Sequence, residues 1–214
     1  MNKSILDEQI EYYRARAQEY DESIAEAFDL LSPGKDLLLA LGKFDAILEL
    51  ACGTGIWTET LLHMGKAVTA VDAAPEMLEI ARNKFGDERI KYQQSDLFQW
   101  EPTQKYDLVF FANWLSHVPP SALDEFLGRV QRSIHSNGQF AIVDQYQPSD
   151  LDKRIAKDNI YATRPVEDGR HFTIVKAFYD LPYLHNKVEQ LGFDVSINKF
   201  SDTFFFLAGK RKHS

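Results

Sequence analysis

One stretch of the sequence, from Ile47 to Gly55 (Ile-Leu-Glu-Leu-Ala-Cys-Gly-Thr-Gly), limits what this chain can fold into more than any other. An apolar run that ends in Gly-x-Gly is typical of a buried strand that breaks into a tight turn, where the backbone can approach a ligand closely. Asp72 follows after a second short apolar run, at the place where a carboxylate can accept hydrogen bonds from ribose hydroxyls. The chain is therefore predicted to bind a nucleoside-containing cofactor.

Apolar strand patterns alternate with helical patterns through most of the chain. Strands are expected at residues 46–51, 67–71, 90–93, 108–112 and 139–144, and helices at residues 57–64, 75–85 and 121–134. This alternation predicts an α/β fold with a mainly parallel sheet covered by helices on both faces. A helix at residues 182–191 and two consecutive strands at residues 193–198 and 203–208 predict an antiparallel terminal hairpin.

Two segments depart from the alternation. Residues 5–31 are rich in helix formers, and Pro33-Gly34 is predicted to end that stretch before a further helical piece at residues 35–41. Residues 146–180 are polar and contain Pro165. We expect three parts, namely residues 1–42 as an N-terminal helical lid, residues 43–214 as the main domain, and residues 146–180 as a cap inserted into it.

The composition narrows the classes of partner. The formal net charge of −8 argues against a broad electrostatic contact with nucleic acid or anionic lipid. No apolar run is long enough to span a bilayer, and the start has no apolar core of the signal-peptide type. Cys52 is the only cysteine, which favours a reducing compartment, so we expect a cytoplasmic protein. His63, His135, His185 and His213 lack metal-ligand spacing, so we predict no metal, and the oligomeric state is left open.

Four blocks carry a resemblance to a known family. They are Glu-Leu-Ala-Cys-Gly-Thr-Gly, then Val-Thr-Ala-Val-Asp72, then Gln-Ser-Asp96-Leu97, then Tyr-Asp-Leu-Val-Phe-Phe-Ala-Asn113-Trp114. The first block lacks the third glycine of a dinucleotide-binding turn, because Thr58 stands there. In this order and at these spacings, the blocks resemble the class I S-adenosylmethionine (SAM)-dependent methyltransferases of the small-molecule type. The resemblance is close over residues 44–145 and holds in outline over the whole chain.

The resemblance implies a fold and a cofactor. The fold is a Rossmann-like sheet of seven mostly parallel strands with an antiparallel terminal hairpin, and the cofactor is SAM, with S-adenosylhomocysteine (SAH) as its product. Gly53 and Gly55 would pass close to the methionine part of SAM, and Glu49 would lie behind the turn near its amino end. Asp72 would hold both ribose hydroxyls. Glu49 and Asp72 are equally suited to capping a helix, and that alternative is left open.

The same resemblance implies contacts to the adenine. Asp96 would accept a hydrogen bond from the adenine amino group, and Leu97 would offer its backbone amide. Ala73 and Met77 would flank the ring. The expected cofactor set is completed by Ala51, at a place where glycine is also frequent, and by Asn113 in the fourth block.

The segment from Tyr12 to Tyr20 (Tyr-Tyr-Arg-Ala-Arg-Ala-Gln-Glu-Tyr) resembles the leader helix of many small-molecule members of the family. Such a helix covers the cofactor, where the aromatic faces of Tyr13 and Tyr20 suit a sulfonium cation. Arg16 or Arg14 would bind the methionine carboxylate. The tyrosines could equally be packing residues of an amphipathic helix.

Candidates for catalysis and acceptor binding come from two less regular segments. His117 follows the fourth strand, at the sheet edge where open α/β sheets bind ligands, and is the candidate general base. Its alternative role is to hydrogen-bond the loop and shape the floor of the pocket. Trp114 is expected to wall the methyl-transfer site. In the insert, Arg170, Lys176 and Tyr179 are candidates for binding an anionic or aromatic acceptor. The commoner alternative is that the basic residues are surface charges that balance neighbouring acidic residues.

These observations predict methyl transfer to an oxygen or nitrogen of a small molecule. A carbon acceptor on a quinone-like ring and a non-catalytic SAM-binding protein are the alternatives. An RNA or protein methyltransferase is the main rival among enzymes, and the acidic charge counts against nucleic acid as its substrate. The fourth block also reads Asn113-Trp-Leu-Ser, without the Asn/Asp-Pro-Pro-Phe/Tyr signature of base-amino methylation.

Overall fold

The computed structural model describes residues 3–25, 28–146 and 160–212. The strands are β1 (Phe44–Leu50), β2 (Gly65–Asp72), β3 (Ile90–Gln94), β4 (Tyr106–Ala112), β5 (Ile134–Gln145), β6 (Tyr161–Pro165), β7 (His171–Val175), β8 (Phe193–Lys199) and β9 (Phe204–Arg211). The helices are α1 (Lys3–Ala15), α2 (Tyr20–Ile24), α3 (Phe28–Leu39), α4 (Thr58–Met64), α5 (Pro75–Phe85), α6 (Pro120–Arg132) and α7 (Leu181–Gln190), with a 3-10 turn, η2 (Leu115–His117).

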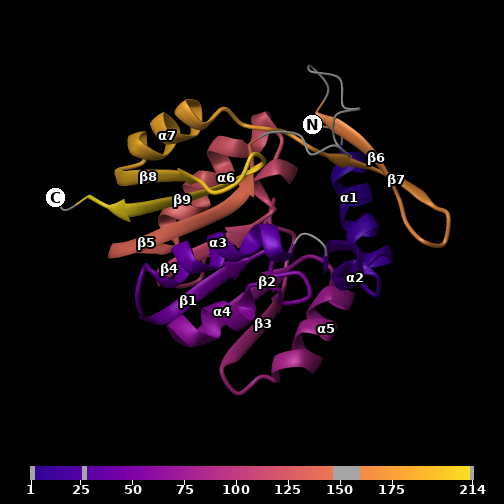
Figure 1. Ribbon diagram of the computed structural model, residues 1–214, viewed down its shortest axis with the longest axis horizontal. Coiled ribbons are helices and arrows are strands. Elements are labelled where there is room, and N and C mark those ends of the chain that lie inside the picture. Colours follow the sequence, from indigo (N-terminus) through magenta and orange to yellow (C-terminus); the bar gives the residue numbers. More distant parts are fainter. Residues whose placement is uncertain (1–2, 26–27, 147–159, 213–214) are drawn as a thin grey trace.

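Seven strands form the main sheet in the order β3-β2-β1-β4-β5-β9-β8 (Figure 1). Strands β1 to β5 pair in parallel, whereas β9 is antiparallel to both β5 and β8. The predicted mostly parallel sheet with an antiparallel terminal hairpin is therefore confirmed. The strand order reverses between β1 and β4, and the crevice at the carboxyl ends of such strands is where open α/β sheets bind ligands.

Each face of the sheet is covered because the strands are apolar on both sides. Ile47 and Phe110 lie in the core layer shared with buried residues of α3, α4 and α5. Leu48 and Phe111 lie in the opposite layer, with α6 and α7. Alternate residues of a strand point to opposite faces, so the continuous apolar runs of β1 and β4 serve both layers.

The expected helix end at Pro33-Gly34 was wrong, because α3 runs from Phe28 to Leu39 through both residues. Pro33 is exposed and stands inside α3, where its missing amide removes one hydrogen bond of the helix. Gly34 is buried, and a Cβ there would lie 3.0 Å from the ring of Phe200. The glycine thus serves close packing, and the helical stretch breaks earlier, between α1 and α2.

The predicted cap at residues 146–180 falls partly outside the described residues, which omit 147–159. Its described part contains β6 and β7, which pair with each other in a separate antiparallel hairpin. Helix α1 packs along β7, and Figure 1 shows both beside the carboxyl edge of the main sheet. The division into a lid at residues 1–42 and a main domain stays a prediction.

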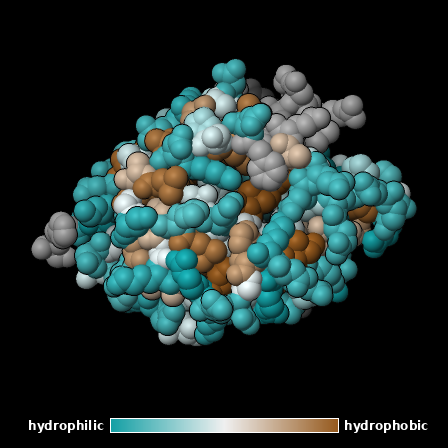
Figure 2. All heavy atoms as spheres, turned by 60° about the horizontal axis from the view of Figure 1, so that its bottom comes forward, coloured by the Kyte–Doolittle hydropathy of each residue, from teal (hydrophilic) through white to brown (hydrophobic). Residues whose placement is uncertain are grey.

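The face drawn in Figure 2 is mainly hydrophilic. Figure 2 shows one face on which apolar residues gather only in small separate patches. Among the described residues, no helix is both long and apolar enough to cross a membrane.

Candidate functional site

A cavity with an empty volume of about 620 Å³ lies at the carboxyl ends of β1 to β4. Most of the predicted cofactor residues line it, together with two candidates for chemistry at the transfer site. These residues are Tyr13, Tyr20, Ala51, Gly53, Asp72, Ala73, Met77, Asp96, Leu97, Asn113, Trp114 and His117. We name this space the first cavity.

Asp72, the last residue of β2, fixes the turn that borders the first cavity. One carboxylate oxygen accepts a hydrogen bond from the Gly53 amide (2.8 Å) and the other from the Ala74 amide (2.9 Å). Burial raises the pKa of Asp72, while the hydrogen bonds from Ala74 and Gly53 act in the opposite direction. A carboxylate held in this way has further lone pairs for ligand hydroxyls.

Two residues of the first cavity have left-handed backbone conformations. Ala51, just after β1, and Asn113, just after β4, both have φ of 53°. Such angles are unfavourable for residues with a Cβ, and they concentrate at functional sites. The amide of Asn113 donates to the carbonyl of Val143 (2.8 Å), which anchors one of these turns to β5.

Three residues of the first block lie behind the turn. The Glu49 carboxylate accepts a hydrogen bond from the Thr58 hydroxyl (2.6 Å), and burial raises the pKa of Glu49 to about 8. Gly55 has φ of +89°, and a Cβ there would lie 2.6 Å from the ring of Phe85. Cys52 is buried in the same turn, and burial raises the pKa of its thiol well above the usual value. Unlike Gly53, neither Glu49 nor Gly55 lines the first cavity.

The adenine-side candidates lie after β3. Asp96 accepts hydrogen bonds from the Phe98 amide and the Gln99 side chain, both at 2.9 Å. Leu97 is buried beside it. Trp114 faces the cavity from the opposite turn, and its indole N–H is buried without a hydrogen-bond partner among the described residues. An unpaired buried donor at a cavity wall fits a polar ligand group.

His117 has both ring nitrogens engaged. Nδ1 lies 2.7 Å from the carbonyl oxygen of Val175, which can only accept, so Nδ1 carries the proton. Nε2, 2.7 Å from the Tyr13 hydroxyl, therefore accepts from it. Burial, with Lys176 next in importance, lowers the pKa of His117 to about 3, so the ring is neutral near pH 7. This geometry favours the alternative role, in which His117 shapes the pocket, while its role as a base stays a prediction.

A second cavity adjoins the first, and the two share Tyr13, Tyr20, Asn113 and His117 as lining residues. Cationic side chains line this second cavity, namely those of Arg16, Arg164 and Lys176. Arg16 donates to the Tyr12 and Ser23 hydroxyls (both 2.6 Å), and its guanidinium lies over the rings of Tyr12 and Tyr20. Arg16 thus lines the second cavity and not the first.

Lys176 is the most buried of these cations, with only 9 % of its surface exposed. Its ammonium nitrogen lies 3.3 Å from the Ser116 hydroxyl, and burial lowers its pKa to about 8. No carboxylate in the described part of the chain lies within ion-pair distance of it. A buried ammonium group in this setting suits an anionic ligand.

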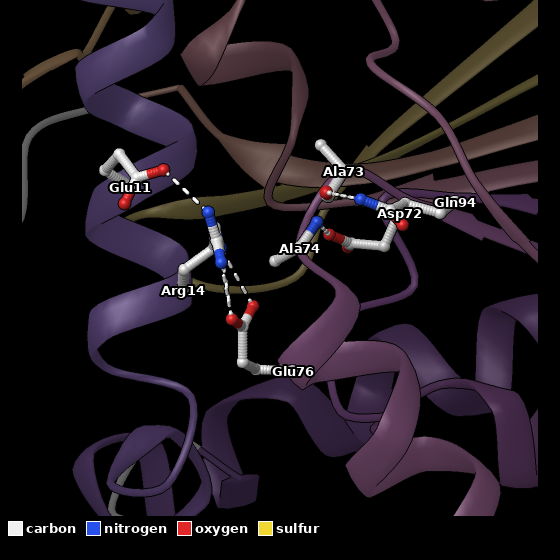
Figure 3. A network of polar contacts seen from close by, with 7 residues as sticks. All are labelled: Glu11, Arg14, Asp72, Ala73, Ala74, Glu76 and Gln94. Carbon is white, nitrogen blue, oxygen red and sulfur yellow. Dashed lines mark hydrogen bonds and ion pairs between the residues drawn. The ribbon is translucent and has the colours of Figure 1, made fainter.

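Three other candidates lie elsewhere. Arg14 binds both carboxylate oxygens of Glu76 and also Glu11, so it ties α1 to α5 next to the Asp72 turn (Figure 3). Arg170 is exposed at the turn of the β6–β7 hairpin and pairs with Asp168. The Tyr179 hydroxyl donates to the carbonyl of Val118 (2.6 Å) within the core. Neither Arg170 nor Tyr179 lines the two cavities.

Some lining residues were missed by the sequence reasoning. Gln9 is buried on α1, where its side chain accepts from the Val175 amide (3.0 Å) and donates to the His117 carbonyl (3.4 Å). Nothing in its sequence context distinguishes it from other polar helix residues. Phe98 and Gln145 directly follow a predicted block and a predicted strand, respectively, so position alone could have indicated them.

Comparisons with known proteins indicate the family of the chain. The family described as "Methyltransferase domain" matches residues 47–138. DhpI is 32% identical in a structure titled as its SAM-HEP complex, with a TM-score of 0.88 over 98% of this chain and 99% of that one. The structure titled as its SAH complex has a TM-score of 0.86 over 99% and 98% of the two chains.

A curated relative, the malonyl-[acyl-carrier protein] O-methyltransferase of Paenibacillus sp. (strain JDR-2), is 28% identical over 58% of this chain and 48% of its own. The same-named protein of Acetivibrio thermocellus is 42% identical over 65 residues, which are 29% of this chain and 23% of that protein. The chain thus spans less than half the length of these two curated relatives. Together, the sheet order, the cofactor cavity and the similarity to DhpI over nearly the whole length show that this chain belongs to the class I SAM-dependent methyltransferases.

Proposed function

We propose that the chain transfers the methyl group of SAM to an oxygen of a small anionic acceptor, which Lys176 and Arg164 hold in the second cavity. The observation that carries this proposal is the buried Lys176 ammonium group beside the cofactor cavity, without a carboxylate at ion-pair distance among the described residues. Arg164 adds a second positive charge to the same cavity. A buried ammonium group is balanced best by an anionic ligand.

The first cavity supports a matching assignment for the cofactor. Asp72 would hold the ribose, and Met77 and Leu97 would enclose the adenine ring. Arg16 stays a candidate for the methionine carboxylate, which would extend from the first cavity past the shared residues to the second cavity, where Arg16 lies. When bound, SAM supplies an already activated methyl group. The chain would then contribute alignment of the two reactants, which is worth roughly 7–11 kcal/mol in favourable cases.

An anionic oxygen acceptor also accounts for the state of His117. A general base is needed only where the acceptor arrives protonated. The neutral His117 ring is occupied by Tyr13 and Val175, so we propose that it positions Tyr13 at the shared wall. An oxyanion reaches the site already deprotonated and needs neither residue as a base.

The relatives lend support of two kinds. The curated names state O-methyl transfer, which favours oxygen as the acceptor atom. The DhpI-SAM-HEP complex is a precedent for a further component bound together with SAM in this family. We further propose that α1, α2 and the β6–β7 hairpin act as a cover over both cavities.

The test is a methyl-transfer assay that measures SAH release on a matched panel. The panel pairs small carboxylates, phosphate monoesters and phosphonates with neutral alcohols, amines and quinols of the same carbon skeleton. Turnover on oxyanions, reduced in Lys176→Met, supports the proposal. Turnover on neutral acceptors alone would refute it, and SAH binding with no turnover on any acceptor would favour a non-catalytic binding protein.

A further inference from the structure

A buried polar cluster lies beneath the second cavity and joins three elements. Asp144, the second-last residue of β5, is 1 % exposed, and its carboxylate accepts from the amides of Ser116 (3.1 Å) and Gln145 (2.7 Å). Ser116, in η2, lies between Asp144 and Lys176, because its hydroxyl is 3.3 Å from the Lys176 ammonium nitrogen. The Ser116 carbonyl also accepts from the Ala177 amide (2.7 Å), so the η2 turn fixes the backbone next to Lys176.

Charged groups from several elements act on Lys176. Asp144 from β5 and Arg164 from β6 act on Lys176 through their charges, and the charge of Lys176 acts on His117 in η2. Ser116 in η2 and the ring of Phe178, at 5.4 Å, lie beside its ammonium group. Tyr13 from α1 and Arg16 from the turn after α1 line the same cavity. Of the charged groups, Arg164 lowers the pKa of Lys176 and Asp144 raises it. Lys176 in turn lowers the pKa of Asp144, which burial raises. Asp144 is the one carboxylate of the described residues that favours the charged form of Lys176.

We infer that Asp144 is a positioning residue of the acceptor site, which keeps Lys176 protonated and, through Ser116, directs its ammonium group into the second cavity. This inference rests on the proposed function only in giving Lys176 an anion to bind. Without a nearby negative charge, a buried lysine between arginines loses its proton. The cavity would then lose one of its positive charges in the neutral pH range.

The inference predicts the effect of Asp144→Asn. The substitution removes the charge but keeps the shape and an oxygen for the amide of Ser116. Lys176 has a pKa of about 8, and Asp144 is one of the influences that hold it up. Its loss is expected to lower the pKa of Lys176 by roughly 1 to 3 units. At pH 8, Lys176 would then be mostly neutral.

The direct measurement is the pKa of Lys176 in the full chain bound to SAH, from the pH dependence of its ¹³Cε NMR signal. Lysine-selective ¹³C labelling gives the signals, and Lys176→Arg assigns the one that disappears. We expect a downward shift of about one unit or more in Asp144→Asn. The same pKa in both proteins would overturn the inference.

Sulfate, which stays dianionic across this pH range, is the anion probe. In the parent protein we expect sulfate to raise the pKa of Lys176. In Asp144→Asn we expect sulfate to bind about fivefold more weakly at pH 8, because a decrease of one unit from a pKa of about 8 lowers the protonated fraction of Lys176 from about one half to about one tenth. In a Lys176→Arg background, Asp144→Asn should leave the pH dependence of sulfate binding unchanged, because arginine does not titrate there. A drop of the same size in that background would mean a merely structural effect and would overturn the inference.

Ser116→Ala provides a second route if Asp144→Asn does not fold. It removes the hydroxyl beside Lys176 but keeps the amide that binds Asp144. We expect a smaller decrease of the Lys176 pKa with SAH affinity intact, and no decrease would count against the inference. If the pKa of Lys176 depends on Asp144 but no oxyanion is methylated, the proposed function fails and the inference stands. If oxyanions are methylated but the pKa of Lys176 is the same with and without Asp144, the proposed function stands and the inference fails.

Discussion

The two cavities share a wall of four residues but are built in different ways. The first is formed mainly by segments that follow parallel strands, with α1 and Tyr20 completing its lining, and its main polar contacts are between a carboxylate and backbone amides of neighbouring turns. The second is formed by side chains from α1, α2, α3, the end of β5, the β6–β7 hairpin and the start of β9. The first is therefore set by the sheet itself, and the second by which side chains the surrounding elements bring to it. Changes in one should leave the other nearly intact.

The largest effect is expected for Asp72→Ala. Hydrogen bonds to a charged group are worth roughly 1.5–3 kcal/mol each, so losing both ribose contacts should weaken SAH binding by about 100-fold or more. Isothermal titration calorimetry measures this affinity. Asp45→Ala is the matched control, since Asp45 is an exposed carboxylate at the other end of the sheet, paired with Lys66. Unchanged SAH affinity in Asp72→Ala would remove the basis of the cofactor assignment.

Lys176→Met tests the second cavity. We expect KM for an anionic acceptor to rise about tenfold or more, because a charge-assisted hydrogen bond is lost. The Kd for SAH should change by less than about twofold, since additivity holds for separate sites. Arg170→Met is the control, because Arg170 lies at the exposed hairpin turn. If Lys176→Met and Arg170→Met had equal effects, the second cavity would not be the acceptor site.

His117→Gln examines the wall that both cavities share. Glutamine offers one donor for the Val175 carbonyl and one acceptor for the Tyr13 hydroxyl, so a positioning role predicts a rate decrease of less than about tenfold. A general base is worth roughly 100-fold or more, and a loss of that size would assign this role to His117. The rate on a panel acceptor at saturating SAM is the measurement, with Tyr13→Phe as the companion variant.

The same variant makes a prediction about stability. The pKa of His117 is about 3 in the folded protein, and its ordinary value is 6.5. Between these two pKa values, His117 binds a proton in the unfolded chain but not in the folded one. The contribution of the neutral His117 ring to the free energy of unfolding is therefore complete above pH 6.5 and is lost as the pH falls toward 3. Between pH 7 and pH 5, urea unfolding should show a decrease about 2 kcal/mol larger in the parent protein than in His117→Gln. Equal decreases would contradict the neutral buried ring.

Ala51→Gly should have the smallest effect. Glycine relieves the left-handed conformation at φ of 53°, but it adds freedom to the unfolded chain. We expect the free energy of unfolding to change by less than about 1 kcal/mol, and SAH affinity by less than about twofold. Gly55→Ala is the contrasting variant, because its Cβ would meet Phe85, and it should destabilise by about 1–3 kcal/mol. Thermal and urea unfolding measure both.

The same contrast explains what the sequence could predict. The blocks that contain Gly53, Asp72 and Asp96 follow strands that pair in parallel, so their carboxyl ends had to meet at one edge. The second cavity has no such rule. Arg170 and Lys176 lie six positions apart in one basic and aromatic segment, yet one is exposed on a turn and the other is buried. Only the packing of β7 against α1 and η2 decides between them.

The helix boundaries failed for a similar reason. Pro33 and Gly34 are ordinary stop signals, but here tertiary contacts decide their roles, with Gly34 packed against Phe200, far away in the sequence. His117 was found from its position after β4, whereas its tautomer and its occupied nitrogens depend on Tyr13 and Val175 from distant segments. Local pattern thus predicts where a side chain stands, and long-range packing determines its chemical state.

The burial of Cys52 makes this chain convenient for spectroscopy. Its thiol is the only one in the sequence, and at neutral pH it stays protonated and shielded, so it should not react with maleimide dyes. A cysteine introduced at the exposed Gln18, in the turn between α1 and α2, would then carry a single fluorophore with no background labelling. The emission of this fluorophore could report, in real time, how the turn between α1 and α2 responds when a small molecule binds in either cavity.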